Sequence, residues 1–291
     1  MTSGPAVGQI AQEAEPSWTG RLQLRTVRRA DGRTVAAGQF SSGALRVLRP
    51  HYPDGSGQAL ITVVNPGGGF LGADRYAIEY DGGPGSSALL TTQSATKVYR
   101  TPPGPARQHQ KIRLAAGALL ESVPDQLIAY RDAEFVQRTD VDLHPEACYF
   151  AAEVVTPGWS PDAEPFTYQE VRLQTIIRCG GTPLLWDNLV LRPRTTNPRD
   201  LGWLEGRSHC ASVIAAGPGV DRRCLDLLRE LADAFDGVHV GASLLSRPGL
   251  VLRALGQDTG TLTELVRQVG TVIRAEAWPG TAPKTWDLRK Y

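Results

Sequence analysis

Three glycines supply the clearest chemical motif in this chain. Gly67, Gly69 and Gly72 have the G-x-G-x-x-G spacing of a dinucleotide-binding loop, and the apolar residues 59–64 predict the strand that precedes such a loop. In that motif a helix begins at the third glycine, and its first amides bind the pyrophosphate. Residues 75–80 instead alternate between polar and apolar side chains, which predicts a strand. A nucleotide-binding enzyme is therefore the less favoured interpretation.

The glycine segment is better explained as a turn or crossover between strands. Glycine tolerates positive φ because it lacks a Cβ atom, and the sequence GGPG at residues 82–85 would end any helix early. The sequence also contains neither a G-K-[ST] phosphate loop nor a G-x-S-x-G nucleophile motif. We therefore predict a protein that is not an enzyme.

Soft metal ligands are few and scattered. The cysteines at positions 148, 179, 210 and 224 form no C-x-x-C pair, so we expect unpaired, packed thiols in a reducing compartment. His209 adjoins Cys210, and imidazole and thiolate are both ligands of divalent transition metals. This pair lacks the additional ligands of a stable site, and the sequence leaves open whether it contacts metal.

Most of the chain has a period of two residues. Residues 21–25, 75–80 and 171–177 alternate in polarity, as strands with one covered face do. Clusters of Gly and Pro separate such segments at short intervals. We expect about a dozen or more strands before residue 215 and therefore a mainly β fold.

The last quarter of the chain has a different pattern. Apolar residues at helical spacing predict a helix over 221–235, and a second apolar stripe predicts a helix from Thr261. Thr261 and Glu264 have the spacing of a capping box at its N-terminus. Residues 238–240 and 250–253 resemble strands, so this end is predicted to mix helices and strands and to pack on the β body.

Length and charge limit the classes of partner. We expect a disordered tail over residues 1–17 and a single domain over 18–291. The chain has 31 Lys and Arg against 30 Asp and Glu, a net charge of +1 that lacks the basic excess of nucleic-acid-binding proteins. It contains no secretory leader pattern and no apolar stretch long enough to span a bilayer. We predict a soluble, cytoplasmic protein that binds neither nucleic acid nor membrane.

Two segments carry a resemblance to a known family. Residues 65–74 (NPGGGFLGAD) and 90–100 (LTTQSATKVYR) resemble signatures of the urease accessory protein family UreD, called UreH in some bacteria. The resemblance extends over residues 18–288. Further segments match the family pattern in the same order, at residues 43–50, 117–126, 241–243, 252–256 and 283–286. The chain departs from the family pattern at Gly158-Trp159 and Ala163-Glu164, where members often have Gly-Arg and then Gly-Glu.

The resemblance implies a non-catalytic scaffold in urease maturation. It implies a helicoidal, two-layer β-rich fold with two α-helices near the C-terminus. It also implies binding to UreF, through UreF to the GTPase UreG, and to the apo-urease subunits, and it allows a dimer within the UreD-UreF-UreG complex. Such proteins are proposed to conduct Ni²⁺ transiently through an internal tunnel, with no tightly bound cofactor. A purely structural adaptor without a metal path is the alternative.

Oxygen ligands would suit a nickel conduit, because hard, weakly held donors let the ion move on. Asp74 directly follows the glycine segment, although it could equally cap a turn there. Glu153 interrupts an apolar run and Asp187 follows one. A lone carboxylate is costly to bury in such surroundings. Thr96 offers a hydroxyl, although threonine is also common in strands. Three more carboxylates are weaker candidates for the conduit: Glu121, Asp125 and Glu164.

Overall fold

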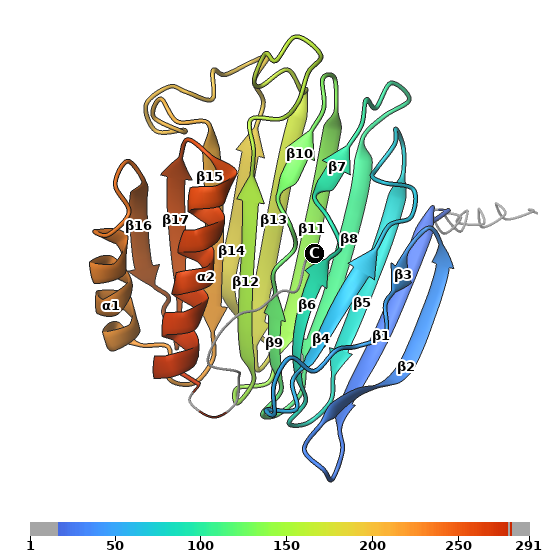
Figure 1. Ribbon diagram of the computed structural model, residues 1–291, viewed down its shortest axis with the longest axis vertical. Helices are drawn as coiled ribbons and strands as arrows, with labels where there is room; N and C mark the ends of the chain where they lie inside the picture. The colour runs from blue at the N-terminus through green and yellow to red at the C-terminus, as the bar shows by residue number, and fades with distance from the viewer. Residues whose placement is uncertain (1–16, 279, 281–291) are drawn as a thin grey trace, which may run out of the picture.

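Two β-sheets stack face to face to form the body of the protein. The computed structural model describes residues 17–278 and 280, and in it two helices cover the outer surface of one sheet (Figure 1). The predicted mainly β, two-layer fold with two helices towards the C-terminus is confirmed. The predicted tail up to residue 16 and the segment 283–286 lie outside the described residues.

The two sheets differ in size. The seven-stranded sheet has the order β14 (Thr182–Leu191), β13 (Glu170–Cys179), β11 (Glu134–Leu143), β8 (Ala106–Leu114), β5 (Arg75–Gly82), β1 (Gly20–Arg28) and β2 (Thr34–Gly43). The ten-stranded sheet has the order β16 (His239–Leu244), β17 (Gly249–Gly256), β15 (His209–Ala216), β12 (Cys148–Val155), β9 (Leu119–Ser122), β6 (Ser87–Thr92), β4 (Ala59–Val64) and β3 (Arg46–Val47). Its two remaining short strands are β7 (Thr96–Val98) and β10 (Leu127–Ala129), which pair with each other, and β10 also pairs with β12.

The chain coils by passing repeatedly from one sheet to the other. Strands β4, β6, β9 and β12 belong to the ten-stranded sheet, whereas β5, β8, β11 and β13 lie between or after them in the sequence and belong to the seven-stranded sheet. Within each group neighbouring strands are parallel, as successive turns of one coil must be. Antiparallel pairs such as β1 with β2 and β12 with β15 lie towards the two ends. The fold is therefore an irregular solenoid.

Two apolar cores result from this arrangement. On β12, Tyr149 packs between the sheets, whereas the next residue, Phe150, packs between the ten-stranded sheet and the helices. A strand covered on both faces has a nearly continuous apolar sequence, as this one does. On β1 only alternate residues such as Leu22 and Leu24 are buried, because the described chain covers one face of the seven-stranded sheet. Because of the helices, the ten-stranded sheet is covered on both faces, whereas the described chain covers one face of the seven-stranded sheet.

The two helices begin at aspartate caps. Helix α1 (Arg222–Ala232) begins after Asp221, and helix α2 (Thr259–Glu276) begins after Asp258. The prediction that Thr261 starts the second helix was wrong: the Asp258 carboxylate accepts hydrogen bonds from the Thr261 amide and hydroxyl at 2.8 and 2.7 Å. An aspartate three positions earlier satisfies the free amides of the first turn, so no threonine cap is needed. Among the described residues, neither helix is long and apolar enough to cross a membrane.

The glycine segment carries the chain from β4 in one sheet to β5 in the other. A strand, β5, follows it, so the dinucleotide-loop interpretation was wrong. Positive φ occurs at Gly68 and at Ala73, whereas the motif glycines serve close contacts. A Cβ atom on Gly69 would lie 2.6 Å from the Lys97 carbonyl oxygen, and one on Gly72 would lie 2.5 Å from Pro103 Cδ. Close packing therefore explains these glycines better than turn conformation alone.

Candidate functional site: a polar cavity between the sheets

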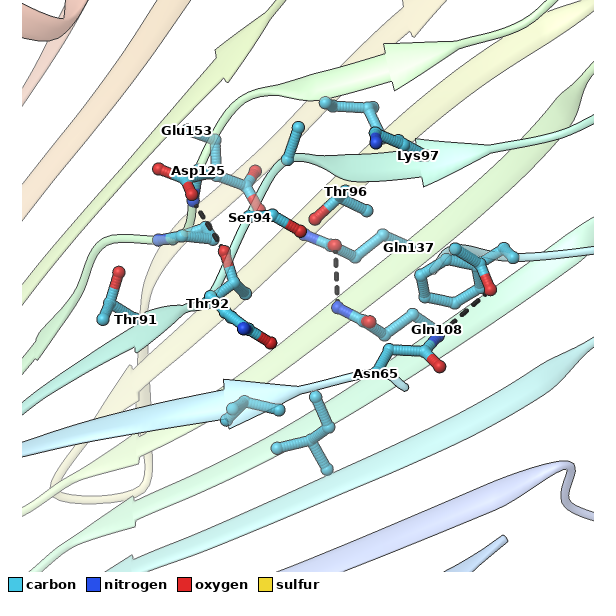
Figure 2. Close-up of a pocket in the computed structure, with 18 of the residues that line it drawn as sticks. Asn65, Thr91, Thr92, Ser94, Thr96, Lys97, Gln108, Asp125, Gln137 and Glu153 are labelled. Atoms are coloured by element: carbon cyan, nitrogen blue, oxygen red, sulfur yellow. Dashed lines mark hydrogen bonds between the residues drawn. The ribbon is translucent and has the colours of Figure 1, made fainter. Parts of the chain in front are cut away.

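A line of cavities runs between the two sheets. The first has a volume of about 110 Å³ and lies beside the glycine segment (Figure 2). A narrow one of about 20 Å³ and a wider one of about 380 Å³ adjoin it. Glu153 lines all three, so the cavities meet at this carboxylate. The site is thus a set of adjoining cavities between the layers.

Polar side chains from the seven-stranded sheet line the floor of these cavities. At the inward positions of β8, Gln108 and Gln110 lie between the apolar Ala106 and Ile112. The same apolar, polar, polar, apolar order recurs on β11, where Gln137 and Thr139 are the polar pair, and β13 contributes one hydroxyl, that of Thr175. Because register places these strands side by side, their amides and hydroxyls form one continuous polar band.

Glu153 projects from the opposite sheet onto this band. It alternates on β12 with Tyr149, which also faces the space between the sheets. Gln108 Nε2 donates to Gln137 Oε1 at 3.0 Å, and Gln137 Nε2 in turn donates to Glu153 Oε1, so the three side chains follow one another across the cavity (Figure 2). Burial raises the pKa of Glu153, and the nearby Asp187 carboxylate raises it further. The Gln137 hydrogen bond and the Arg253 charge oppose this rise.

Asp187 lies at the next cavity and is neutralised there. Arg253, on β17, forms an ion pair with Asp187 and also donates to the Ser212 hydroxyl. Because this ion pair occupies Asp187, Glu153 is the carboxylate at the junction that has a glutamine, not a cation, as its hydrogen-bond partner. The sequence analysis missed Arg253. Its signal is an arginine at an inward position in the apolar run 250–255.

Thr96 and Asp125 belong to the first cavity and not to the other two. Both line the first cavity, Thr96 from the start of β7 and Asp125 from the loop after β9. The Asp125 amide donates to the Thr92 hydroxyl at 2.9 Å, which fixes this loop against the end of β6 (Figure 2). The structure therefore brings four predicted conduit residues to adjoining cavities: Thr96, Asp125, Glu153 and Asp187.

The remaining three predicted residues do not line these cavities. Asp74 accepts a hydrogen bond from the Leu71 amide at 2.7 Å and closes the turn before β5, so the turn-cap alternative describes it. Glu121 is fully buried on the other face of the ten-stranded sheet, where Arg274 of α2 holds it. Glu164 is exposed in the loop after β12. Consecutive side chains of a strand point to opposite faces, so Glu121 faces α2 whereas its neighbour Ser122 lines the first cavity.

The soft-ligand pair His209-Cys210 does not form a metal centre. As consecutive residues of β15, the two side chains point to opposite faces of the sheet. Burial lowers the pKa of His209 and raises that of the Cys210 thiol to about 11, which disfavours the thiolate that binds metal. Within residues 17–278 and 280, no group of three or more His, Cys, Asp or Glu side chains converges to hold a metal ion.

Comparison with known proteins decides the family. The profile described as "UreD urease accessory protein" matches residues 19–287 of this chain. The chain belongs to the UreD urease accessory protein family. The "Urease accessory protein UreD" of Actinomyces naeslundii is 47% identical over 275 residues, which cover 94% of this chain and 100% of that protein. The protein of the same description from Paenarthrobacter aurescens is 46% identical over 279 residues, with 94% and 95% covered.

A third UreD relative extends the agreement along the whole sequence. The protein from Arthrobacter sp. strain FB24 is 45% identical over an alignment that covers 100% of this chain and 99% of its own length. The family resemblance found in the sequence is therefore confirmed, and it supports a role in urease maturation. The cavity just described is a feature of a UreD protein.

Proposed function

We propose that this UreD protein is a non-catalytic scaffold that conducts Ni²⁺ between its two sheets during urease maturation. The observation that carries the proposal is the line of cavities, bordered by amide, hydroxyl and carboxylate oxygens, that meets at Glu153. Such donors bind a hydrated divalent ion weakly, so they guide it without holding it. A closed cage of imidazoles or thiolates would bind tightly and stop transfer.

The narrow cavity sets the size of what can pass. A buried water needs about 10–15 Å³ of such space, so a cavity of about 20 Å³ has room for one water, whereas its two neighbours have room for several. An ion that retains much of its hydration shell can therefore occupy the wide cavities. At the narrow cavity it exchanges water for protein oxygens or displaces the walls, and Glu153 supplies an oxygen there.

Charge at this narrow point favours exchange of a proton for a metal ion. The raised pKa of Glu153 reflects the cost of burying its charge, and a passing cation would offset that cost. Ni²⁺ binding would therefore release the proton, and protonation would release Ni²⁺. Asp187 also lines the narrow cavity, but Arg253 neutralises it through an ion pair. A second negative charge that would bind Ni²⁺ more tightly is therefore absent from this cavity.

The protein partners follow from the same proposal. UreD proteins would bind UreF, through it UreG, and the apo-urease subunits, in the cytoplasm. Large exposed apolar side chains support a protein contact near the widest cavity: Leu201 is 88% and Trp203 41% exposed, and Trp203 lines that cavity. A purely structural adaptor is the competing function. It would need no continuous polar passage between the sheets.

Removal of the Glu153 charge separates the conduit from the adaptor. The Glu153→Gln variant would be co-expressed with UreF, UreG and the urease subunits, and Glu164→Gln, on the exposed loop, is the matched control. We expect both variants to assemble with their partners in a pull-down, but urease matured with Glu153→Gln to contain at least about tenfold less nickel, since a carboxylate ligand is lost. Equal nickel content with the two variants would favour the adaptor.

A further inference from the structure

The outer face of the seven-stranded sheet is open in the described chain. Both helices pack against the other sheet, so β5, β8, β11 and β13 present alternate side chains outwards (Figure 1). These residues face away from the cavity between the sheets. Any role of this surface is therefore independent of the proposed metal path.

One row of residues across this face is unusually basic. Register places Arg75 of β5 opposite Arg107 of β8, Arg107 opposite Val136 of β11, and Val136 opposite Arg172 of β13. We call Arg75, Arg107 and Arg172 the arginine row. Strands lie about 4.8 Å apart, so the row extends about 15 Å. Like charges directly opposite each other destabilise a sheet, so a structural role does not explain this row.

The far end of the same face has the opposite design. Six residues further along these strands, successive neighbours alternate in charge across the sheet, in the order Arg25, Asp81, Arg113, Asp142 and Arg178. The Arg113 guanidinium donates to Asp81 at 3.1 Å. Cross-strand pairs of opposite charge stabilise the sheet. The same sheet thus balances its arginines across the strands at one end, whereas at the other end Arg75 and Arg107 lie directly opposite each other.

Within the arginine row, Arg172 forms an ion pair with Glu170, in which Arg172 Nε lies 2.9 Å from a carboxylate oxygen. In the part of the chain that the structure describes, no ion pair involves Arg75 or Arg107. Arg75 instead packs over the Trp18 ring, 5.7 Å from its centroid. The row borders a surface hollow of about 260 Å³, which Trp18, His109 and Arg138 also line.

We propose that the arginine row is a docking surface for a carboxylate-rich segment of a partner protein. Guanidinium groups bind carboxylates through paired hydrogen bonds, and arginines beside an aromatic ring are typical of protein interfaces. A nucleic-acid duplex fits less well. It carries a negative charge about every 1.7 Å and would extend over Glu79 and Asp140, which lie beyond the neighbouring row.

The test uses the full-length protein and poly-L-glutamate as the probe. Arg107→Gln with Arg172→Gln removes two charges from the row, and Arg113→Gln with Arg178→Gln removes two charges from the same strands at the balanced end. We expect the first double variant to bind labelled poly-L-glutamate about five- to tenfold more weakly in fluorescence anisotropy, as the loss of two exposed charge pairs implies. The second should bind within about twofold of the unsubstituted protein.

Three results would overturn the inference. The first is equal binding by the row variant and the unsubstituted protein when both have the same thermal unfolding midpoint. The second is an equal loss of binding in the balanced-end variant, which would show only a response to net charge. The third is binding of a DNA duplex as tight as that of poly-L-glutamate, which would assign the surface to polyphosphates.

Discussion

Glu121 is buried and Glu153 half-buried, on adjacent strands of one sheet, and the two carboxylates have opposite surroundings. Glu121 faces α2, where Arg274 Nε donates to it at 2.5 Å and Gln58 donates at 2.9 Å. Glu153 faces the cavities, where it accepts from the neutral amide of Gln137. A carboxylate held by a buried guanidinium is fixed in position. One matched by an amide beside open space is available to a cation.

The largest expected effect comes from removal of Arg274, which would break the fixed half of this comparison. Arg274 is 3% exposed and Glu121 is fully buried, so Arg274→Met leaves a buried carboxylate without its cation. We expect a loss of about 3–5 kcal/mol in the free energy of unfolding, measured by urea denaturation. Glu121→Leu combined with Arg274→Met should lose less than half as much. A single variant as stable as the unsubstituted protein would show that Glu121 is not held in this way.

The pH dependence of stability tests the other half. The folded pKa of Glu153 is raised above its ordinary value of 4.5 by burial, so the folded state holds this proton more tightly than the unfolded state. Its contribution to stability is therefore fully present below about pH 4.5 and is lost as pH rises through the folded pKa. Glu153→Gln should equal the unsubstituted protein at low pH and exceed it in stability at pH 7–8. Parallel stability curves across this range would contradict a raised pKa.

Asp74 gives the smallest expected effect and sharpens the division between structural and transit carboxylates. Its carboxylate accepts from the Leu71 amide in a turn outside the three cavities. Asp74→Ala should lower the free energy of unfolding by about 1 kcal/mol, the usual contribution of one such hydrogen bond. Nickel in urease matured with this variant should equal that obtained with the unsubstituted protein. A loss of nickel in urease that exceeds the small loss of stability would instead indicate that Asp74 takes part in the conduit.

Local pattern predicted the strands and helices well, because alternation and helical spacing are properties of neighbouring residues. It found β5 after the glycine segment and so excluded the dinucleotide loop. It also found Glu153, since a carboxylate in an apolar strand is conspicuous. Glu121 was a weaker candidate, and its partner Arg274, 153 residues away, could not be inferred from the sequence.

The polar band was missed for a different physical reason. A glutamine in an alternating strand is ordinarily assigned to the solvent side, yet Gln108 and Gln137 occupy inward positions between buried apolar residues. Each glutamine comes two residues after a buried apolar residue, Ala106 or Phe135, and therefore lies on the same face of its strand. This spacing is the feature of the sequence that indicates an inward position. Only the register between strands shows that these separate polar interruptions form one continuous polar band.

The most direct measurement tests whether nickel passes the narrow cavity. Ala151 lines that cavity beside Glu153, and Ala151→Leu would fill its volume of about 20 Å³ without changing any charge, whereas Ala151→Ser would leave it open. Urease would be matured with each variant, and its nickel content measured after a pull-down shows equal assembly with UreF and apo-urease. We predict near-complete loss of nickel with Ala151→Leu and retention with Ala151→Ser. Full nickel content with Ala151→Leu in an assembled complex would contradict transit between the sheets.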